Sequence, residues 1–128
     1  MLFRSLVSIV GQDFSAEQRG LLSDRGIDLA GVQVAKGETF RWGGRYHANY
    51  DDRDTTFTEL NVLSMFDPEI PRSYRDSRYV LLGNVDPSAQ LKVLDQLKNP
   101  EVVVVDTMNY WLESAPDQVE KEIGRAHV

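Results

Sequence analysis

The sequence contains no cysteine, so it has neither a disulfide bond nor a thiolate metal ligand. No apolar run reaches the length of a membrane span, and no secretory signal is recognisable, although a lost native amino terminus could have carried one. These absences agree with a reducing compartment and with a protein that does not cross a membrane. A cytoplasmic location is therefore the expectation.

Clusters of lysine and arginine are also missing. The chain has 14 basic and 20 acidic residues and a formal net charge of -6, which argues against a nucleic-acid partner. A small molecule is the better candidate. Histidine is scarce, and His47 lies in the acidic stretch 47–54 beside Asp51, Asp52 and Asp54. We interpret this stretch as a solvated loop, and we predict no metal site.

Glycine-rich phosphate loops are absent as well. Gly11 follows an apolar run, but neither G-x-x-x-x-G-K-[ST] nor G-x-G-x-x-G occurs in the chain. We therefore predict no nucleotide loop, and we interpret Gly11 and Asp13 as parts of a structural turn.

The first half of the chain alternates between extended and helical patterns. Residues 6–10 predict a strand, and Ser15 with Gln18 predicts the start of a helix that Gly26 ends. The segments 31–34, 39–46 and 55–62 look extended. Partial alternation of the aromatic residues along the last two segments predicts a β-hairpin with one covered face, which would include Phe40, Trp42, Tyr46 and Phe57.

The second half repeats the strand–helix order. Residues 78–82 predict a buried strand, and Asp86 followed by Pro87 predicts the start of a helix. The four valines at 102–105 are typical of a central parallel strand covered on both faces. A last helix is expected from Ser114. This order predicts a three-layer α/β core with an inserted hairpin.

Polar side chains follow two of the expected strands directly. Asn84 ends the strand 78–82, and Asp106 and Asn109 follow the four valines. Open α/β sheets bind ligands at the carboxyl ends of their strands, so these are the first candidates for a binding site. The alternative is local: Asp106 caps a turn, Asn109 satisfies loop backbone and Asn84 adopts a tight turn.

Five motifs resemble the ribokinase/PfkB family of carbohydrate kinases in order and spacing: VSIVGQD at 7–13, RGID at 25–28, GETF at 37–40, VLLGN at 80–84 and VVVVDTMN at 102–109. The resemblance implies an incomplete, Rossmann-like parallel sheet with a lid hairpin at about 37–62. It implies acceptor contacts by Asp106, Asn109, Asn84 and Arg41, with ATP and Mg²⁺ as cofactors of the intact parent. We expect this chain by itself to bind neither.

The lid strands of that family cover the sugar, exclude water and often pair in a homodimer. Arg41, Trp42, Arg45 and Tyr46 could therefore face substrate, a partner or solvent. One departure from the family is that some members carry an arginine where this chain has Tyr110 or Trp111.

Both ends of the chain look non-native. Residues 122–128 match the translation of a common sequencing adapter, and residues 1–5 match its reverse complement with GTG as start codon. We therefore expect residues 6–121 to be one partial kinase domain from a gene fragment. The Gly-Ala-Gly-Asp-like turn that carries the catalytic base in the family would lie beyond Lys121, so no catalytic residue is assigned.

The expected function is that of a fragment of an ATP-dependent sugar kinase, which transfers the γ-phosphoryl group of ATP to a carbohydrate hydroxyl and is inactive alone. One alternative is a nucleoside (adenosine-like) kinase of the same family. Another is a non-catalytic α/β module that binds a metabolite or nucleotide. A third is a truncated translation product without function.

Overall fold

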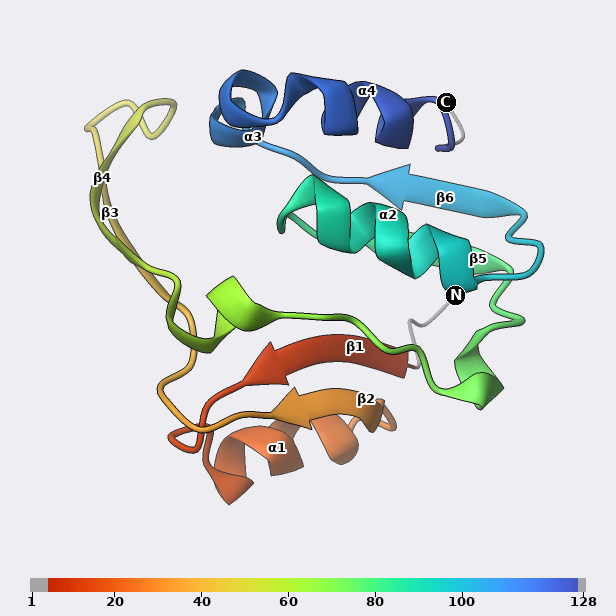
Figure 1. Cartoon of the computed structure of the whole chain (residues 1–128). Coiled ribbons are helices and arrows are strands. Elements are labelled where there is room, and N and C mark those ends of the chain that lie inside the picture. The colour runs from red at the N-terminus through yellow and green to blue at the C-terminus, as the bar shows by residue number, and fades with distance from the viewer. Residues whose placement is uncertain (1–4, 127–128) are drawn as a thin grey trace. The chain divides into compact units, whose positions relative to one another are not determined.

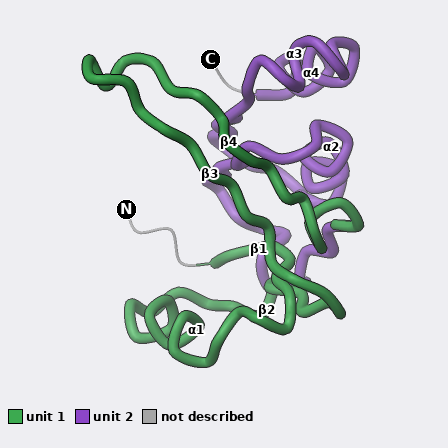
Figure 2. The backbone as a smooth tube through the Cα atoms, turned by 90° about the vertical axis from the view of Figure 1, so that its left-hand side faces the viewer, with its two compact units in different colours: residues 1–66 green, residues 67–128 purple. Residues whose placement is uncertain are grey.

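The computed structural model describes residues 5–126, which form two compact units divided between Phe66 and Asp67 (Figure 2). Residues 1–4 and 127–128 belong to the ends that the sequence analysis sets aside as non-native, and they lie outside the described residues. The described strands pair two by two, as β1–β2, β3–β4 and β5–β6. No helix within residues 5–126 has the length and apolar character needed to cross a membrane.

The first unit begins with a β-α-β passage (Figure 1). Strands β1 (Ser5–Val10) and β2 (Asp28–Val34) pair in parallel, and α1 (Ala16–Ser23) connects them. The predicted start of this helix is confirmed, because Ser15 Oγ accepts a hydrogen bond from the Gln18 backbone while Gln18 Oε1 accepts one from the Ser15 backbone. The predicted left-handed stop at Gly26 is confirmed by its φ of 74°.

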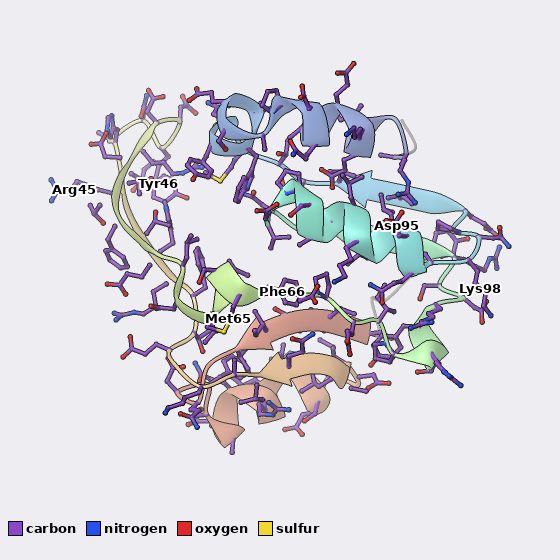
Figure 3. The ribbon with its side chains drawn as sticks, in the orientation of Figure 1. Arg45, Tyr46, Met65, Phe66, Asp95 and Lys98 are labelled. Atoms are coloured by element: carbon purple, nitrogen blue, oxygen red, sulfur yellow. The ribbon has the colours of Figure 1, made fainter. Side chains whose placement is uncertain are left out.

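A β-hairpin follows, made of β3 (Arg41–Tyr46) and β4 (Arg53–Glu59). The strand expected up to residue 62 ends at Glu59, since Asn61 has a left-handed φ of 48° and begins the short 3-10 helix η1 (Asn61–Met65). Figure 3 shows Arg45 and Tyr46 on opposite sides of β3, which is the expected alternation of a strand.

The prediction that one face of the hairpin is covered was wrong. The aromatic side chains on both faces are exposed, with Trp42 at 39% and Phe57 at 42% of full accessibility. Phe57 pairs with Gly43 across the strands, so it shares the face of Arg41 and not that of Trp42. A bulge lies between Gly43 and Gly44. A Cβ at Gly43 would lie 2.2 Å from the Phe57 ring, so the glycine makes room for this ring.

The second unit contains another β-α-β passage. After the short 3-10 helix η2 (Arg72–Tyr74), strands β5 (Tyr79–Leu82) and β6 (Val102–Val105) pair in parallel, and α2 (Pro87–Gln96) connects them. Leu82, Leu94 and Val103 form the core of this passage, with α2 on one face of the strand pair (Figure 1). This α/β class, with parallel strands and connecting helices, is the predicted one.

Two details of the second unit differ from expectation. The four valines of β6 are buried on one face only: Val103 is 1% exposed, whereas Val104 is 50% exposed, because α2 covers only the side of Val103. The helix expected from Ser114 is preceded by another, α3 (Asn109–Ser114), and itself begins later as α4 (Pro116–Ile123). The break between them falls at Ala115, directly before a proline, which disfavours helical backbone at the preceding residue.

Candidate functional site

The carboxyl ends of β5 and β6 lie side by side and are joined by one buried amide. The backbone of Asp106 donates to the Leu82 carbonyl at 2.9 Å, which extends the strand pairing by one step. Gln90 Nε2, on α2, donates to the Gly83 carbonyl at 2.8 Å and to the Asp106 carbonyl at 3.1 Å. A single side chain therefore holds both strand ends in a fixed relation.

Gln90 is held in place by the helix that carries it. Asp86 caps the start of α2, where its Oδ1 accepts from the Ser88 backbone at 2.8 Å, and Pro87 begins the helix. Gln90 is 2% exposed, and its Oε1 has no hydrogen-bond partner in the described structure. Sequence reasoning missed this residue. The available signal was a polar side chain at the spacing of the buried Leu94 and of Leu97 on the apolar face of the helix.

Asn84 lies at the end of β5, as predicted, and its side chain forms a hydrogen bond with an aromatic side chain. Its Oδ1 accepts a hydrogen bond from Trp111 Nε1 at 3.0 Å. Trp111 also meets Tyr110 edge to face, with 4.8 Å between the ring centroids and 76° between the planes. Asn84 thus connects the end of β5 to α3, a contact that the sequence did not indicate.

Asp106 and Asn109 lie at the end of β6 and in the first turn of α3, and both are exposed. The structure therefore brings Asn84 and Asp106 to neighbouring strand ends, with Asn109 three residues further along the chain. Their ligand contacts remain predictions. A carboxylate and two amides can accept from and donate to the hydroxyls of a polyol, so the arrangement suits an acceptor rich in hydroxyl groups.

Arg41, the fourth predicted site residue, belongs to the hairpin of the first unit. Its guanidinium Nη1 lies 3.5 Å from Glu59 Oε2, in a pair that is more than 45% exposed on both sides, and its Cζ lies 5.9 Å from the centre of the Phe57 ring. These contacts stay within β3 and β4. A substrate role for Arg41 remains a prediction.

The carboxyl end of β1 is filled by the chain itself. Asp13 Oδ1 accepts from both the backbone and the hydroxyl of Thr39 at 2.7 Å, and the hydrogen bond from that hydroxyl lowers the pKa of Asp13. The Gly11 backbone donates to the same hydroxyl oxygen at 2.9 Å. A Cβ at Gly11 would lie 2.3 Å from the Gly37 carbonyl oxygen. The interpretation of Gly11 and Asp13 as a structural turn is confirmed.

The polar hairpin tip, residues 47–54, contains a side-chain contact between His47 Nε2 and Asp54 Oδ2, 3.0 Å apart. Both side chains are largely exposed. Within residues 5–126, no three histidine or carboxylate side chains converge in a way that suits a metal ion.

Known proteins match this chain by sequence and by fold, although no protein-family model matches it. The chain is 33% identical over 100 residues to the cytidine kinase of Thermococcus kodakarensis, an alignment that covers 77% of this chain and 35% of that protein. It superimposes on the crystal structure of the Methanocaldococcus jannaschii nucleoside kinase, an archaeal member of the ribokinase family, with a TM-score of 0.71. That match covers 96% of this chain and 41% of the other, at 18% identity.

The observed structure thus defines an α/β chain with parallel strands and connecting helices. More specifically, its resemblance to the ribokinase family, inferred from the five motifs, is confirmed. The chain spans only 35% of the cytidine kinase and 41% of the solved nucleoside kinase.

Proposed function

We propose that this chain supplies the acceptor side of an ATP-dependent kinase of the ribokinase type, and that the acceptor is a nucleoside. The observation that carries the proposal is the pair of strand ends tied together by Gln90, where Asn84 and Asp106 project polar groups. The sequence match to a cytidine kinase and the fold match to a nucleoside kinase support the choice of acceptor.

The chemistry of the strand ends suits the sugar part of such an acceptor. A ribose hydroxyl can donate to the carboxylate of Asp106 and accept from the amide of Asn84 or Asn109. A free sugar offers the same hydroxyls, so a carbohydrate acceptor is the second candidate. These contacts would orient the hydroxyl that receives the phosphoryl group, and orientation is a large part of catalysis in phosphoryl transfer.

The described residues do not by themselves fit ATP and Mg²⁺. The amino end of α2, a place where a phosphate could bind, is already capped by the carboxylate of Asp86. The strand end of β1 is closed by Thr39 and Asp13. We therefore propose that the triphosphate and the catalytic base are held by other parts of the intact kinase.

The hairpin is proposed as a lid and as a contact between two copies of the kinase. Its exposed aromatic side chains, among them Trp42, Tyr46 and Phe57, support this proposal, because exposed aromatic clusters are frequent at interfaces.

The test is acceptor-dependent release of ADP by the complete gene product, recovered with long reads of the source DNA. The panel contains cytidine, adenosine, ribose and fructose, and the present 128-residue chain serves as an inactive control. Turnover that is fastest with a nucleoside is the expected result. Turnover with free sugars only would favour the carbohydrate kinase, and binding without any ADP release would favour the non-catalytic module.

A further inference from the structure

The aromatic pair Tyr110 and Trp111 is the least explained feature of the strand-end region. Tyr110 is 58% exposed, and its neighbours Met108 and Leu112 are 42% and 46% exposed, so apolar surface gathers next to a polar site. Trp111 is half-buried. An exposed aromatic ring such as that of Tyr110 is costly in water unless a partner covers it. Both rings lie on α3, which begins three residues after Asp106, and this position suggests that the partner is the ligand of the site.

The geometry of the pair is fixed before any ligand arrives. The single polar atom of the Trp111 ring, Nε1, is satisfied by Asn84 Oδ1 at 3.0 Å. The edge-to-face contact with Tyr110, at 4.8 Å, restrains both rings. With its hydrogen bond already made inside the protein, the indole offers only its aromatic surface to a ligand. Such a surface recognises a planar ring by stacking and distinguishes poorly between individual bases.

We propose that the Trp111 ring is the platform on which the heterocyclic base of a nucleoside acceptor stacks, with Asn84 as the positioning residue that holds this ring. The Tyr110 ring, whose plane is turned by 76° from that of Trp111, borders the platform. The inference rests on the proposed function and narrows its acceptor class. A nucleoside has the two chemical parts that this stretch of chain matches: a planar base for the Trp111 ring and ribose hydroxyls for Asp106.

Saturation-transfer NMR on the 128-residue chain tests the platform with cytidine, adenosine and ribose at equal concentrations. We expect transfer to the base protons of both nucleosides and little transfer to free ribose. Trp111→Phe keeps an aromatic ring but loses the hydrogen bond to Asn84, so it should weaken the transfer as Asn84→Ala does, and less than Trp111→Leu. Trp111→Leu should bind cytidine roughly 5- to 100-fold more weakly, the loss expected when one base–aromatic stack is removed. Tyr79→Leu, which removes a 40% exposed aromatic ring at the other end of β5, is the matched control and should change nothing.

The role of Asn84 has its own spectroscopic readout. In a Trp42→Phe background, the remaining indole N–H resonance belongs to Trp111, because the chain has two tryptophans. Asn84→Ala should shift this resonance towards that of a solvent-exposed indole and weaken cytidine binding. Asn84→Asp retains an acceptor oxygen and should restore both. An indole resonance that does not respond to Asn84→Ala would overturn the positioning role.

Steady-state kinetics of the complete gene product provide a second test of the platform. Trp111→Leu should raise the KM for cytidine about 10-fold, within the range for one lost stack, and leave the KM for ATP unchanged. An unchanged KM for cytidine would overturn the platform but not the kinase function. Equal saturation transfer to cytidine and ribose that does not change in Trp111→Leu would do the same. Cytidine binding that depends on Trp111 without ADP release from any acceptor would instead overturn the proposed function and support the platform.

Discussion

The two β-α-β passages of this chain have the same order of elements but are stabilised in different ways. In the second, Pro87, Ala89, Gln90 and Leu94 of α2 are buried, and Leu94 packs with Leu82 and Val103 of the strands. In the first, α1 has no buried residue, and its local support comes from the capping box at Ser15 and the turn at Gly26. Shared topology therefore does not imply shared energetics.

The two passages also differ in whether the polar side chains at their strand ends are used within the protein or exposed. The carboxyl end of β1 is closed by hydrogen bonds between Asp13, Gly11 and Thr39, which leave these groups occupied within the protein. At the carboxyl ends of β5 and β6, the Gln90 side-chain amide donates hydrogen bonds to two backbone carbonyls, and the side chains of Asn84 and Asp106 remain at the surface. The first end is therefore structural, and the proposed function makes the second end the place for a ligand.

The largest expected effect lies in the core of the second passage. Leu94 is 5% exposed and packs with Leu82 and Val103, so Leu94→Ala should cost about 2–5 kcal/mol of unfolding free energy. The matched change on the other helix is Leu21→Ala. Leu21 is 55% exposed, and its replacement should change stability by less than about 0.5 kcal/mol. Chemical denaturation followed by circular dichroism measures both. Equal losses would remove the contrast between the helices.

The pH dependence of the two units should have opposite signs. Glu122 is 0% exposed, its carboxylate has no hydrogen-bond partner in the described structure, and burial raises its pKa from 4.5 to about 7. The folded state then retains a proton that the unfolded state releases, so stability falls as pH rises from about 4.5 to 7. The total loss is up to about 3 kcal/mol. Glu122→Gln should abolish this loss in denaturation series between pH 4 and pH 8.

The pKa of Asp13 is lowered, so its contribution is present above its unfolded value of 3.8 and is lost as pH falls through the folded value. Asp13→Asn should therefore flatten the acid side of the profile, while Glu122→Gln flattens the range from about 4.5 to 7. A wild-type profile without a decline between pH 4.5 and 7 would contradict the burial of an unpaired carboxylate at position 122.

Two glycines test the closed strand end of β1. Gly11→Ala places a Cβ 2.3 Å from the Gly37 carbonyl oxygen, a backbone atom that cannot move alone, and should cost about 1–3 kcal/mol. Gly20→Ala has open space around it within α1 and should gain about 0.5–1 kcal/mol from helix propensity. Denaturation midpoints of the two variants should move in opposite directions. A shift in the same direction would mean that the turn at Gly11 yields easily.

A smaller loss of stability is expected at Gln90 than at Leu94 or Gly11. Gln90→Met keeps the approximate length of the side chain but removes both hydrogen bonds to the strand ends, at a cost of about 1–2 kcal/mol. Amide hydrogen exchange should accelerate at Asp106, whose backbone donates to Leu82. Unchanged exchange at Asp106 would show that Gln90 does not hold the strand ends together.

Local signals in the sequence predicted the local parts of this fold. The pattern Ser15-x-x-Gln18 and the pair Asp86-Pro87 each contain a complete helix start, so both were found. The side-chain hydrogen bond between Asn84 and Trp111 joins residues 27 positions apart and has no local pattern. The hydrogen bonds of Gln90 could not be predicted for the same reason, because they too join residues that are not neighbours in the sequence. The site residues could be proposed from their place after a strand, but the side chains that hold them could not.

The sequence predicted only in part which side chains of the hairpin share a face. Alternation along β3 places Trp42 and Tyr46 on one face, as expected. The position of Phe57 depends on its register against Gly43 next to a bulge, which the sequence does not show. One extra residue in a strand exchanges the faces of all the residues beyond it.

The most direct test of the central assignment compares Asp106→Asn with Asp13→Asn in the complete gene product. We predict that Asp106→Asn lowers kcat/KM for cytidine by about 10- to 100-fold, the equivalent of one hydrogen bond to a charged group, with little change in Tm. Asp13→Asn should lower Tm and leave kcat/KM within about threefold of the wild type. The reverse result, with activity lost at Asp13 and kept at Asp106, would contradict the assignment of the ligand to the ends of β5 and β6.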